Sequence, residues 1–339
     1  MTTLLTKKRF LLVVGGYLLV SAGLLAIAPF FGSESIEPAK VLHGLFSPET
    51  IMDSEIFFFH RIPRVLLAFL VGGSLAVAGN ALQVVLKNPL AEPFILGIAG
   101  GGALGAVVAI SIPGLLIRIG PFSSLQVFSL LGCLLCVWAI YRFSSTRGEI
   151  SMTTILLAGV TVNILCGATI LLIRYLVSPH LLVAMDRWMM GGLDVVGYGE
   201  LSTLLPLLLP GLFLIFIHGN SLNQLALGTE MALGHGVEVG AVHKQVLFGT
   251  GLASAAAVSL AGPIGFVGLI IPHMVRRLSG SDHRIVLPAA FCTGGAFLTL
   301  CDVAARTLVA PTEMPVGIIT ALVGGPVFLK ILFKKERLT

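Results

Sequence analysis

The sequence predicts an all-α membrane protein, a polytopic bundle of about ten transmembrane helices in a single domain over residues 1–339. Three observations lead to this fold class. Hydrophobic residues make up 56% of the chain and charged residues only 11%, whereas a soluble domain carries about 25% charged residues. The mean hydropathy is +1.01. The apolar runs are long and unalternating, which favours helices over the strands of a membrane barrel.

The first two apolar runs set the expected topology. Residues 10–31 form the first span, and three basic residues before it place the N-terminus inside. A more polar connection over 32–60 follows on the outside. The second span, 61–86, carries no charge between Arg64 and Lys87. As a helix, this uncharged stretch of about 22 residues would be about 33 Å long, enough to cross a bilayer core.

Eight further spans are expected to alternate across the membrane, with a short outer helix over 178–200 and a polar inside segment over 219–242. This arrangement puts about 14 of the Lys and Arg residues inside and makes both termini cytoplasmic, in keeping with the positive-inside rule. The eight spans cover residues 94–118, 122–142, 152–177, 201–218, 245–261, 264–274, 286–309 and 316–333.

The second span has one face of small and amide side chains. Gly72, Ala76, Asn80 and Gln83 recur at about one helical turn. Small residues let helix backbones approach closely in lipid, so this face is expected to contact other helices. The two prolines of NPLAEP then end the helix, because proline has no N–H to donate.

The sequence contains no pattern that supports catalysis or a bound cofactor. GGGALG at 100–105 has the spacing of a dinucleotide loop, but no acid lies between Glu92 and Glu149, and helix packing explains the glycines better. No GxxxxGK[ST] occurs, so the chain lacks a phosphate cradle for ATP. The five cysteines lie in apolar runs and are expected to be buried free thiols. They are Cys133, Cys136, Cys166, Cys292 and Cys301.

Charged residues in two apolar contexts suggest specific contacts. Arg61 and Arg64 lie at the outer end of the second span, where they either anchor in the headgroups or dock a soluble partner through charge pairs. Asp302 and Arg306 are four residues apart, so on a helix they share a face and are expected to pair. Pairing lowers the cost of carrying charge inside the membrane.

Two inside segments are interrupted by glycine or proline. The segment 225–244 is either a solvated loop or two short helices, broken at 234–236, that present an apolar knob to a cytoplasmic partner. Farther on, Pro263 and Pro272 lie in a short apolar segment and imply a broken or tilted helix, because proline cannot continue a regular hydrogen-bond ladder. His273 is then a turn residue, and 276–284 form an inside turn.

Together these motifs resemble the FecCD family, the permease subunits of ABC importers for iron–siderophore complexes, haem and vitamin B12. The resemblance begins with RIPR at 61–64 and NPLAEP at 88–93 and covers nearly the whole chain. It continues with ILLAG at 155–159, WMMGG at 188–192, LALG at 225–228, GPIGFVGLIIPH at 262–273, DHR at 282–284, DVAARTL at 302–308 and EMPVGIITALVGGPVFL at 313–329.

The resemblance implies a type II ABC importer permease fold and a set of partners. These are a second permease copy in a homodimer, two ATPase subunits that carry the ATP and Mg, and a periplasmic or lipid-anchored binding protein. It also implies residue roles. Binding-protein docking falls to Arg61, Arg64 and Arg306, ATPase coupling to Gly228, Thr229, Glu230, Met231, Ala232, Leu233 and Gly234, and the cytoplasmic gate to Asn88, Leu90, Met152 and Thr153.

The resulting hypothesis is a permease that moves an iron chelate, a ferric siderophore or haem, across the bacterial inner membrane. A vitamin B12 or other corrinoid importer is the alternative within the family. An ion-coupled secondary transporter would need intramembrane acids, of which Asp302 alone is a poor supply. A membrane enzyme is disfavoured by the missing site. The net charge of +5 requires no nucleic acid, because the basic residues cluster at span ends.

Overall fold

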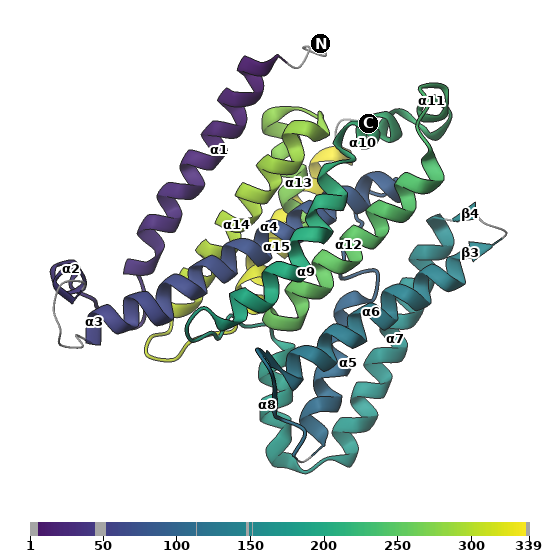
Figure 1. Ribbon diagram of the computed structural model, residues 1–339. Helices are drawn as coiled ribbons and strands as arrows, with labels where there is room; N and C mark the ends of the chain where they lie inside the picture. The colour runs from purple at the N-terminus through teal and green to yellow at the C-terminus, as the bar shows by residue number, and fades with distance from the viewer. Residues whose placement is uncertain (1–5, 45–51, 113, 147–148, 151, 337–339) are drawn as a thin grey trace.

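Figure 1 shows the computed structural model, a bundle of inclined helices around one central helix, α4 (Ile62–Val85). The structure describes residues 6–44, 52–112, 114–146, 149–150 and 152–336. Every residue of α4 from Val71 to Gln83 is buried. The helices that surround α4 are α9 (Gly199–Phe216), α12 (Val239–Ala261), α13 (Val267–Ser279) and α14 (His283–Thr307).

A second group of helices packs beside this core. It consists of α5 (Ile98–Ser111), α6 (Ser124–Ser144) and α7 (Met152–Leu176), with the short α8 (Pro179–Met189) following them. Two more helices complete the bundle, α1 (Lys7–Ile27) against α14 and α15 (Val316–Glu336) against α13 and α14.

Short elements gather at the two ends of the bundle. α1 begins and α15 ends beside α10 (Gly219–Leu227) and α11 (Thr229–Gly234), and this end is called the terminal end below. It also holds the antiparallel pair β3 (Ser145–Thr146) and β4 (Glu149–Ile150). The opposite end holds η1 (Ala28–Phe30), α2 (Pro38–Gly44), α3 (Met52–Glu55), η2 (Ile56–Arg61) and the pair β1 (Arg118–Ile119) and β2 (Phe122–Ser123).

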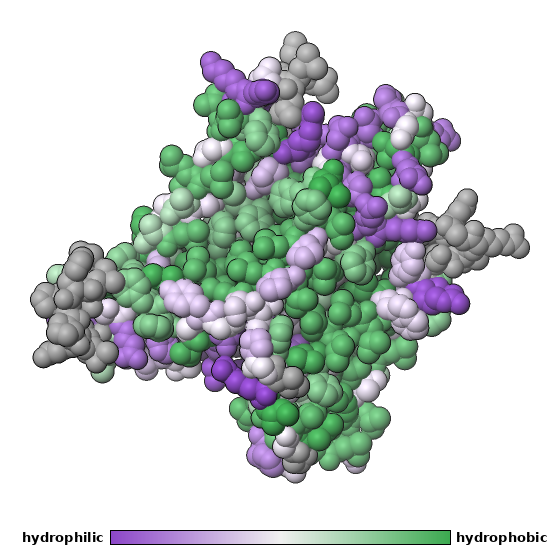
Figure 2. Space-filling model, in the orientation of Figure 1, coloured by the Kyte–Doolittle hydropathy of each residue, from purple (hydrophilic) through white to green (hydrophobic). Residues whose placement is uncertain are grey.

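The apolar surface between the two ends fits a membrane. In the described part of the chain, six helices are long and apolar enough to span a bilayer: Lys7–Phe30, Met52–Val85, Ser124–Phe143, Thr153–Leu176, Gly199–Phe216 and His283–Thr307. With α5, α12, α13 and α15 they follow the order of the ten predicted spans, and α8 matches the short helix expected between two of them. Figure 2 shows a largely hydrophobic surface with hydrophilic residues gathered toward the ends.

Small residues bring the helices into close contact, as the sequence predicted. A Cβ added at Gly72 of α4 would lie 2.3 Å from the carbonyl oxygen of Gly294 on α14. In the GGGALG segment, a Cβ at Gly101 would lie 2.5 Å from the carbonyl oxygen of Gly132 on α6. Both contacts therefore require glycine. The GGGALG segment lies within the helix α5 and does not form a nucleotide-binding loop.

The second span begins earlier than predicted. Its helix runs continuously from Met52 instead of starting at Arg61, and the turn before Pro63 is the π-helix η2. Proline lacks an N–H, so regular hydrogen bonding is lost one turn before it. A neighbouring loop supplies donors instead, with Gly197 N bonding to Phe59 O at 2.6 Å and Tyr198 Oη to Phe58 O at 2.9 Å.

Of the two alternatives expected around Pro272, a broken or a tilted helix, the break is wrong. α13 continues through Pro272 to Ser279, so His273 and Arg276 lie on a helix and not in a turn. Pro272 cannot donate to the carbonyl of Gly268, four residues earlier. Gln83 of α4 donates its Nε2 to that carbonyl at 3.2 Å and to Leu269 O at 3.3 Å. A side chain from another helix thus satisfies the backbone group that proline leaves unpaired.

Candidate functional site

Arg61 lies at the opposite end and is held by backbone carbonyls. Its guanidinium donates Nη1 to Pro29 O and Phe30 O, both at 3.1 Å, and Nη2 to Glu34 O. Gly32 makes room for it, because a Cβ there would lie 2.8 Å from Arg61 Cζ. Arg61 therefore holds the segment that follows α1 in place. None of these hydrogen bonds is to a carboxylate.

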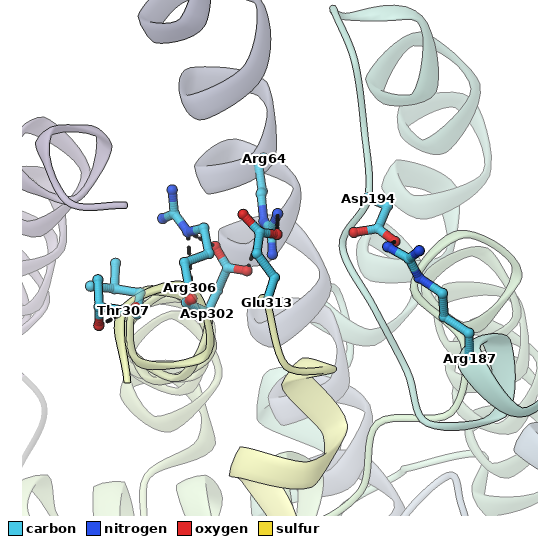
Figure 3. A network of polar contacts seen from close by, with 8 residues as sticks. Arg64, Arg187, Asp194, Asp302, Arg306, Thr307 and Glu313 are labelled. Atoms are coloured by element: carbon cyan, nitrogen blue, oxygen red, sulfur yellow. Dashed lines mark hydrogen bonds and ion pairs between the residues drawn. The ribbon is translucent and has the colours of Figure 1, made fainter. Parts of the chain in front are cut away.

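Four neighbouring residues form a charge cluster, shown in Figure 3: Arg64 of α4, Asp302 and Arg306 of α14, and Glu313 of the loop after α14. Arg64 Nε lies 2.9 Å from Asp302 Oδ1, and Arg64 Nη1 lies 2.6 Å from Glu313 Oε2. Arg306 Nε lies 3.0 Å from Asp302 Oδ2. The predicted Asp302–Arg306 pair is confirmed, and Asp302 is shared with a second arginine.

Because the charge cluster is buried, its stability depends on keeping its positive and negative charges in balance. Asp302 is fully buried and Arg306 is 2% exposed. Two arginines and two carboxylates balance in formal charge, which offsets part of the cost of removing them from water. Removing Asp302 would leave both Arg64 and Arg306 without the carboxylate that they share.

The three predicted docking arginines line one cleft. These arginines border a cavity of about 430 Å³ at the opposite end, and three acids, Glu34, Asp194 and Glu313, also line it. Arg306 Nη2 is buried and has no hydrogen-bond partner among the described residues. The guanidinium fork can bind a carboxylate at two points. Arg306 therefore brings a hydrogen-bond donor without a described partner to this cleft. In the described part of the chain, Arg61 donates to backbone carbonyls and not to a carboxylate.

At the terminal end, the amide side chains of α4 surround another arginine. Arg276 of α13 donates Nη1 to Asn80 Oδ1 at 2.8 Å and Nη2 to Gln83 Oε1 at 2.5 Å. Asn80 Nδ2 lies 3.0 Å from Nδ1 of the buried His283. These four residues form the amide cluster. The sequence predicted the face that carries Asn80 and Gln83 but not Arg276, which was expected in a turn.

The amide cluster connects to α10 through the start of α14. His283 N donates to Asn223 Oδ1 at 2.7 Å, and Asn223 Nδ2 donates to Asp282 Oδ1 at 2.8 Å. Asp282 caps α14 by accepting from Arg284 N at 3.0 Å. Hydrogen bonds from the Arg284 side chain are the main reason that the pKa of Asp282 is lowered to about 2. A hydrogen-bonded path therefore leads from α10 to α4.

The predicted coupling residues form the short helix α11 and its N-cap, Gly228. α11 ends at Gly234, as expected, and a further break at Gly228 separates it from α10. Ala232 is buried and anchors α11, whereas the side chains around it project outward. The exposed apolar residues are Leu227 at 65%, Met231 at 50% and Leu233 at 58%, with Thr229, Glu230 and Gly234 beside them.

Of the predicted gate residues, two lie in the turn after α4 and two at the start of α7. Asn88 Oδ1 accepts from Leu90 N at 2.9 Å, which stabilises the turn. Met152 and Thr153 begin α7, and Thr153 is exposed. The turn meets α7 farther along, where a Cβ at Gly159 would lie 2.9 Å from Ile95 O. No hydrogen bond among the described residues joins Leu90 to Thr153.

The turn after α4 also touches α11. Lys87 Nζ donates to Thr229 Oγ1 at 2.7 Å. Lys87 precedes the predicted gate residue Asn88, and Thr229 belongs to the predicted coupling residues. This contact, which sequence reasoning did not foresee, links the two sets directly.

The described residues contain no cluster of His, Cys, Asp or Glu that could hold a metal ion. The five cysteines are free and buried, as predicted. Cys136 of α6 and Cys166 of α7 bring their Sγ atoms within 3.9 Å.

Residues 18–334 match the FecCD transport family. The chain belongs to this family. It is therefore a membrane-spanning permease of an ABC importer, with the fold of the importer permeases. Its role in the family is that of a transport subunit and not of an enzyme.

Similar proteins span most of this FecCD permease. The hemin transport system permease HmuU of Yersinia pestis is 39% identical over 276 residues, 81% of this chain and 82% of the relative. The cobalamin import system permease BtuC of Halobacterium salinarum is 40% identical over 283 residues, 81% and 73% of the two chains. A solved structure described as a metal-chelate type ABC transporter in an inward-facing conformation has a TM-score of 0.83 at 28% identity, covering 95% of this chain and 99% of its own.

Proposed function

We propose that this permease carries an iron chelate, a ferric siderophore or haem, across the bacterial inner membrane. Relatives named for hemin import and metal-chelate transport support this cargo class. The relative named for cobalamin import, at 40% identity, keeps a corrinoid as the second candidate. The bound cargo would be passed on chemically unchanged.

The observation that carries the proposed division of labour is the contrast between the two ends. The opposite end has a cleft with three arginines, and the terminal end has an exposed apolar helix, α11. In this proposal a soluble binding protein brings carboxylates to Arg61, Arg64 and Arg306. Two ATPase subunits, which carry the ATP and Mg, receive Met231 and Leu233 of α11 in an apolar groove.

The terminal end is then cytoplasmic, with both chain termini inside. Lys87 lies there, with Arg276 and Arg277 in the last turn of α13 and Arg142 in the last turn of α6. Such a bias toward one side is what the positive-inside rule expects of the cytoplasmic face.

A second copy of the chain, in a homodimer, would complete the translocation path of the cargo. α7 exposes Leu157, Ile164, Leu171 and Tyr175 at 65% or more, so it has apolar surface to place against a second copy. In the proposed cycle, ATP closes the ATPase subunits and α11 moves with them. The Lys87–Thr229 contact passes this movement to the gate residues Asn88 and Leu90. Met152 and Thr153 of α7 form the other side of the gate. ATP binding thereby shifts the population between inward- and outward-facing states.

The cargo is tested with the permease, its ATPase and its binding protein together in lipid nanodiscs. ATP hydrolysis is measured after the binding protein is loaded with haemin, ferrichrome or cyanocobalamin. Stimulation by haemin or ferrichrome supports the proposal, and stimulation by cyanocobalamin alone supports the second candidate. If none of the three changes the rate, the proposed cargo class is rejected.

The docking role is tested with Arg306→Lys. Lysine keeps the charge beside Asp302 but cannot bind a carboxylate at two points. Binding-protein affinity should fall while assembly with the ATPase is retained. Arg118→Lys is the matched control, because Arg118 is 78% exposed, pairs with Glu200 and does not line the cleft. Equal affinities for the two variants would contradict the docking role.

A further inference from the structure

An apolar groove of about 540 Å³ lies between α6 and α12, and residues at the starts of α5 and α7 complete its lining. Its lining includes Trp138 and Tyr141 from α6 and Lys244, Phe248 and Leu252 from α12. Figure 1 shows these two helices side by side, running toward the terminal end. From Lys244 to Leu252 the groove follows α12 over nine residues, which rise about 12 Å along the helix. It is separate from the arginine cleft and from α11.

One end of this groove differs chemically from the rest. Lys244 is the single charged residue in its lining. Lys244 is exposed and forms no ion pair with another described residue. It lies five residues after the start of α12, and Tyr141 lies in the last turn of α6, so both are at the terminal end. The deeper lining consists of apolar side chains and a glycine.

Two aromatic residues indicate how deep in the membrane the Lys244 end of the groove lies. Trp138 is 62% exposed and Tyr141 is 37% exposed, on a helix that spans the bilayer. Trp and Tyr side chains concentrate at the membrane–water interface, at the level of the lipid headgroups. The basic Arg142 follows Tyr141 directly. Lys244 is therefore placed where a phosphate group can reach it, with an apolar channel leading from it toward the bilayer centre.

We propose that this groove binds one acyl chain of an anionic phospholipid, with the headgroup phosphate at Lys244. The lining fits a ligand that is apolar along its length and negatively charged at one end. A basic pocket between membrane helices is a known form of anionic lipid site. A second protein helix would match the apolar lining but gives no reason for a lysine at one end.

The position of the groove gives such a lipid a structural consequence. α12 begins after α11, and α6 is joined to α7 by the β3–β4 turn. A lipid in the groove would therefore contact α12, which follows the coupling residues of α11, and α6, which precedes α7. The proposal requires only that the chain lies in a membrane, and not the proposed cargo or docking partners.

Native mass spectrometry tests the proposal on the full permease. The protein is purified in detergent, mixed with phosphatidylglycerol or phosphatidylcholine of identical acyl chains, and scored for retained lipid. Phosphatidylglycerol should be retained preferentially, with one molecule per chain. Lys244→Gln should reduce this retention about fivefold, the factor expected for one basic residue near an anionic lipid. Lys330→Gln, which removes an exposed lysine outside the groove, is the matched control and should leave retention unchanged.

A second variant tests the apolar part of the groove. Leu252→Trp should fill the channel and reduce retention of both lipids, whereas Leu209→Trp, on the exposed face of α9, should not. Equal retention of the two lipids by the unaltered protein would overturn the proposal. So would equal losses for Lys244→Gln and Lys330→Gln. A change of oligomeric state in Leu252→Trp with lipid retention unchanged would instead assign the groove to a second copy of the chain.

Discussion

At the opposite end of α4, Arg64 meets the carboxylates of Asp302 and Glu313, whereas toward the terminal end Arg276 meets the amide oxygens of Asn80 and Gln83. Both arginines join α4 to another part of the bundle. The two carboxylates compensate the positive charge of Arg64, so the charge cluster depends on which acids are present. Amides bring hydrogen bonds without net charge, so the amide cluster depends on geometry.

This difference suits different tasks. A carboxylate from another protein can compete with Glu313 for Arg64, because the two carry the same charge. An amide cluster offers no such exchange, but its hydrogen bonds run through Asn80 and His283 to Asn223 on α10. The charge cluster is thus suited to respond to a partner. The amide cluster is suited to hold α4, α13 and α14 in fixed relative positions.

The largest expected effect comes from breaking the charge cluster with Asp302→Ala. This change leaves Arg64 and Arg306 buried without their shared carboxylate, which should cost about 3–5 kcal/mol of unfolding free energy. Chemical unfolding of the detergent-solubilised protein measures the loss. Glu37→Gln is the control, because the Glu37–Lys40 pair is exposed and its removal should have no measurable effect. A small loss in both variants would mean that the charge cluster is not structurally important.

The amide cluster is tested next with Gln83→Leu. The variant leaves Arg276 with one amide acceptor fewer and Gly268 O without its donor, at an expected cost of about 1–3 kcal/mol. Pro272→Ala restores a backbone N–H that can bond to Gly268 O. The double variant should therefore lose less stability than the sum of the two single changes, measured in the same unfolding assay. Strict additivity would show that Gln83 does not compensate for Pro272.

Asp282→Ala tests the connection between α10 and α14. Loss of this N-cap should cost about 1 kcal/mol. The pKa of Asp282 is lowered to about 2, below the ordinary value of about 3.9. Its contribution to stability is thus complete above about pH 5 and is lost as the pH falls from 5 through 2. Unfolding measured at both pH values should show a smaller difference for Asp282→Ala than for the unaltered protein, and an equal difference would contradict the role of this carboxylate.

The smallest effect on stability is expected for Glu313→Gln. The Glu313 side chain is 36% exposed, so its pair with Arg64 should contribute only about 0.2–1 kcal/mol. Binding-protein affinity should nevertheless rise, because Arg64 loses an internal competitor for the partner's carboxylate. Surface plasmon resonance can compare it with Glu200→Gln, which removes an acid paired with Arg118 at 3.9 Å. Unchanged or weaker binding by Glu313→Gln would argue against competition at Arg64.

Sequence reasoning predicted the features that depend on local pattern. Long apolar runs predicted the order of the helices, six of which are long and apolar enough to span a bilayer. The spacing of Asp302 and Arg306 predicted their pair. The missed features depend on contacts between distant residues. Asp302 is 238 residues from Arg64, and Gln83 is 185 residues from Gly268. The continuation of α13 through Pro272 could not be predicted from proline chemistry alone, since the compensating donor comes from α4.

The central claim is that this permease is a conduit whose ATPase is a separate protein. The most direct measurement is ATP hydrolysis in proteoliposomes that contain the permease alone, the permease with its ATPase, or the Leu233→Glu permease with its ATPase. We predict no hydrolysis by the permease alone, hydrolysis coupled to the loaded binding protein in the second sample, and loss of that coupling in the third. Hydrolysis of ATP by the permease alone would contradict the account.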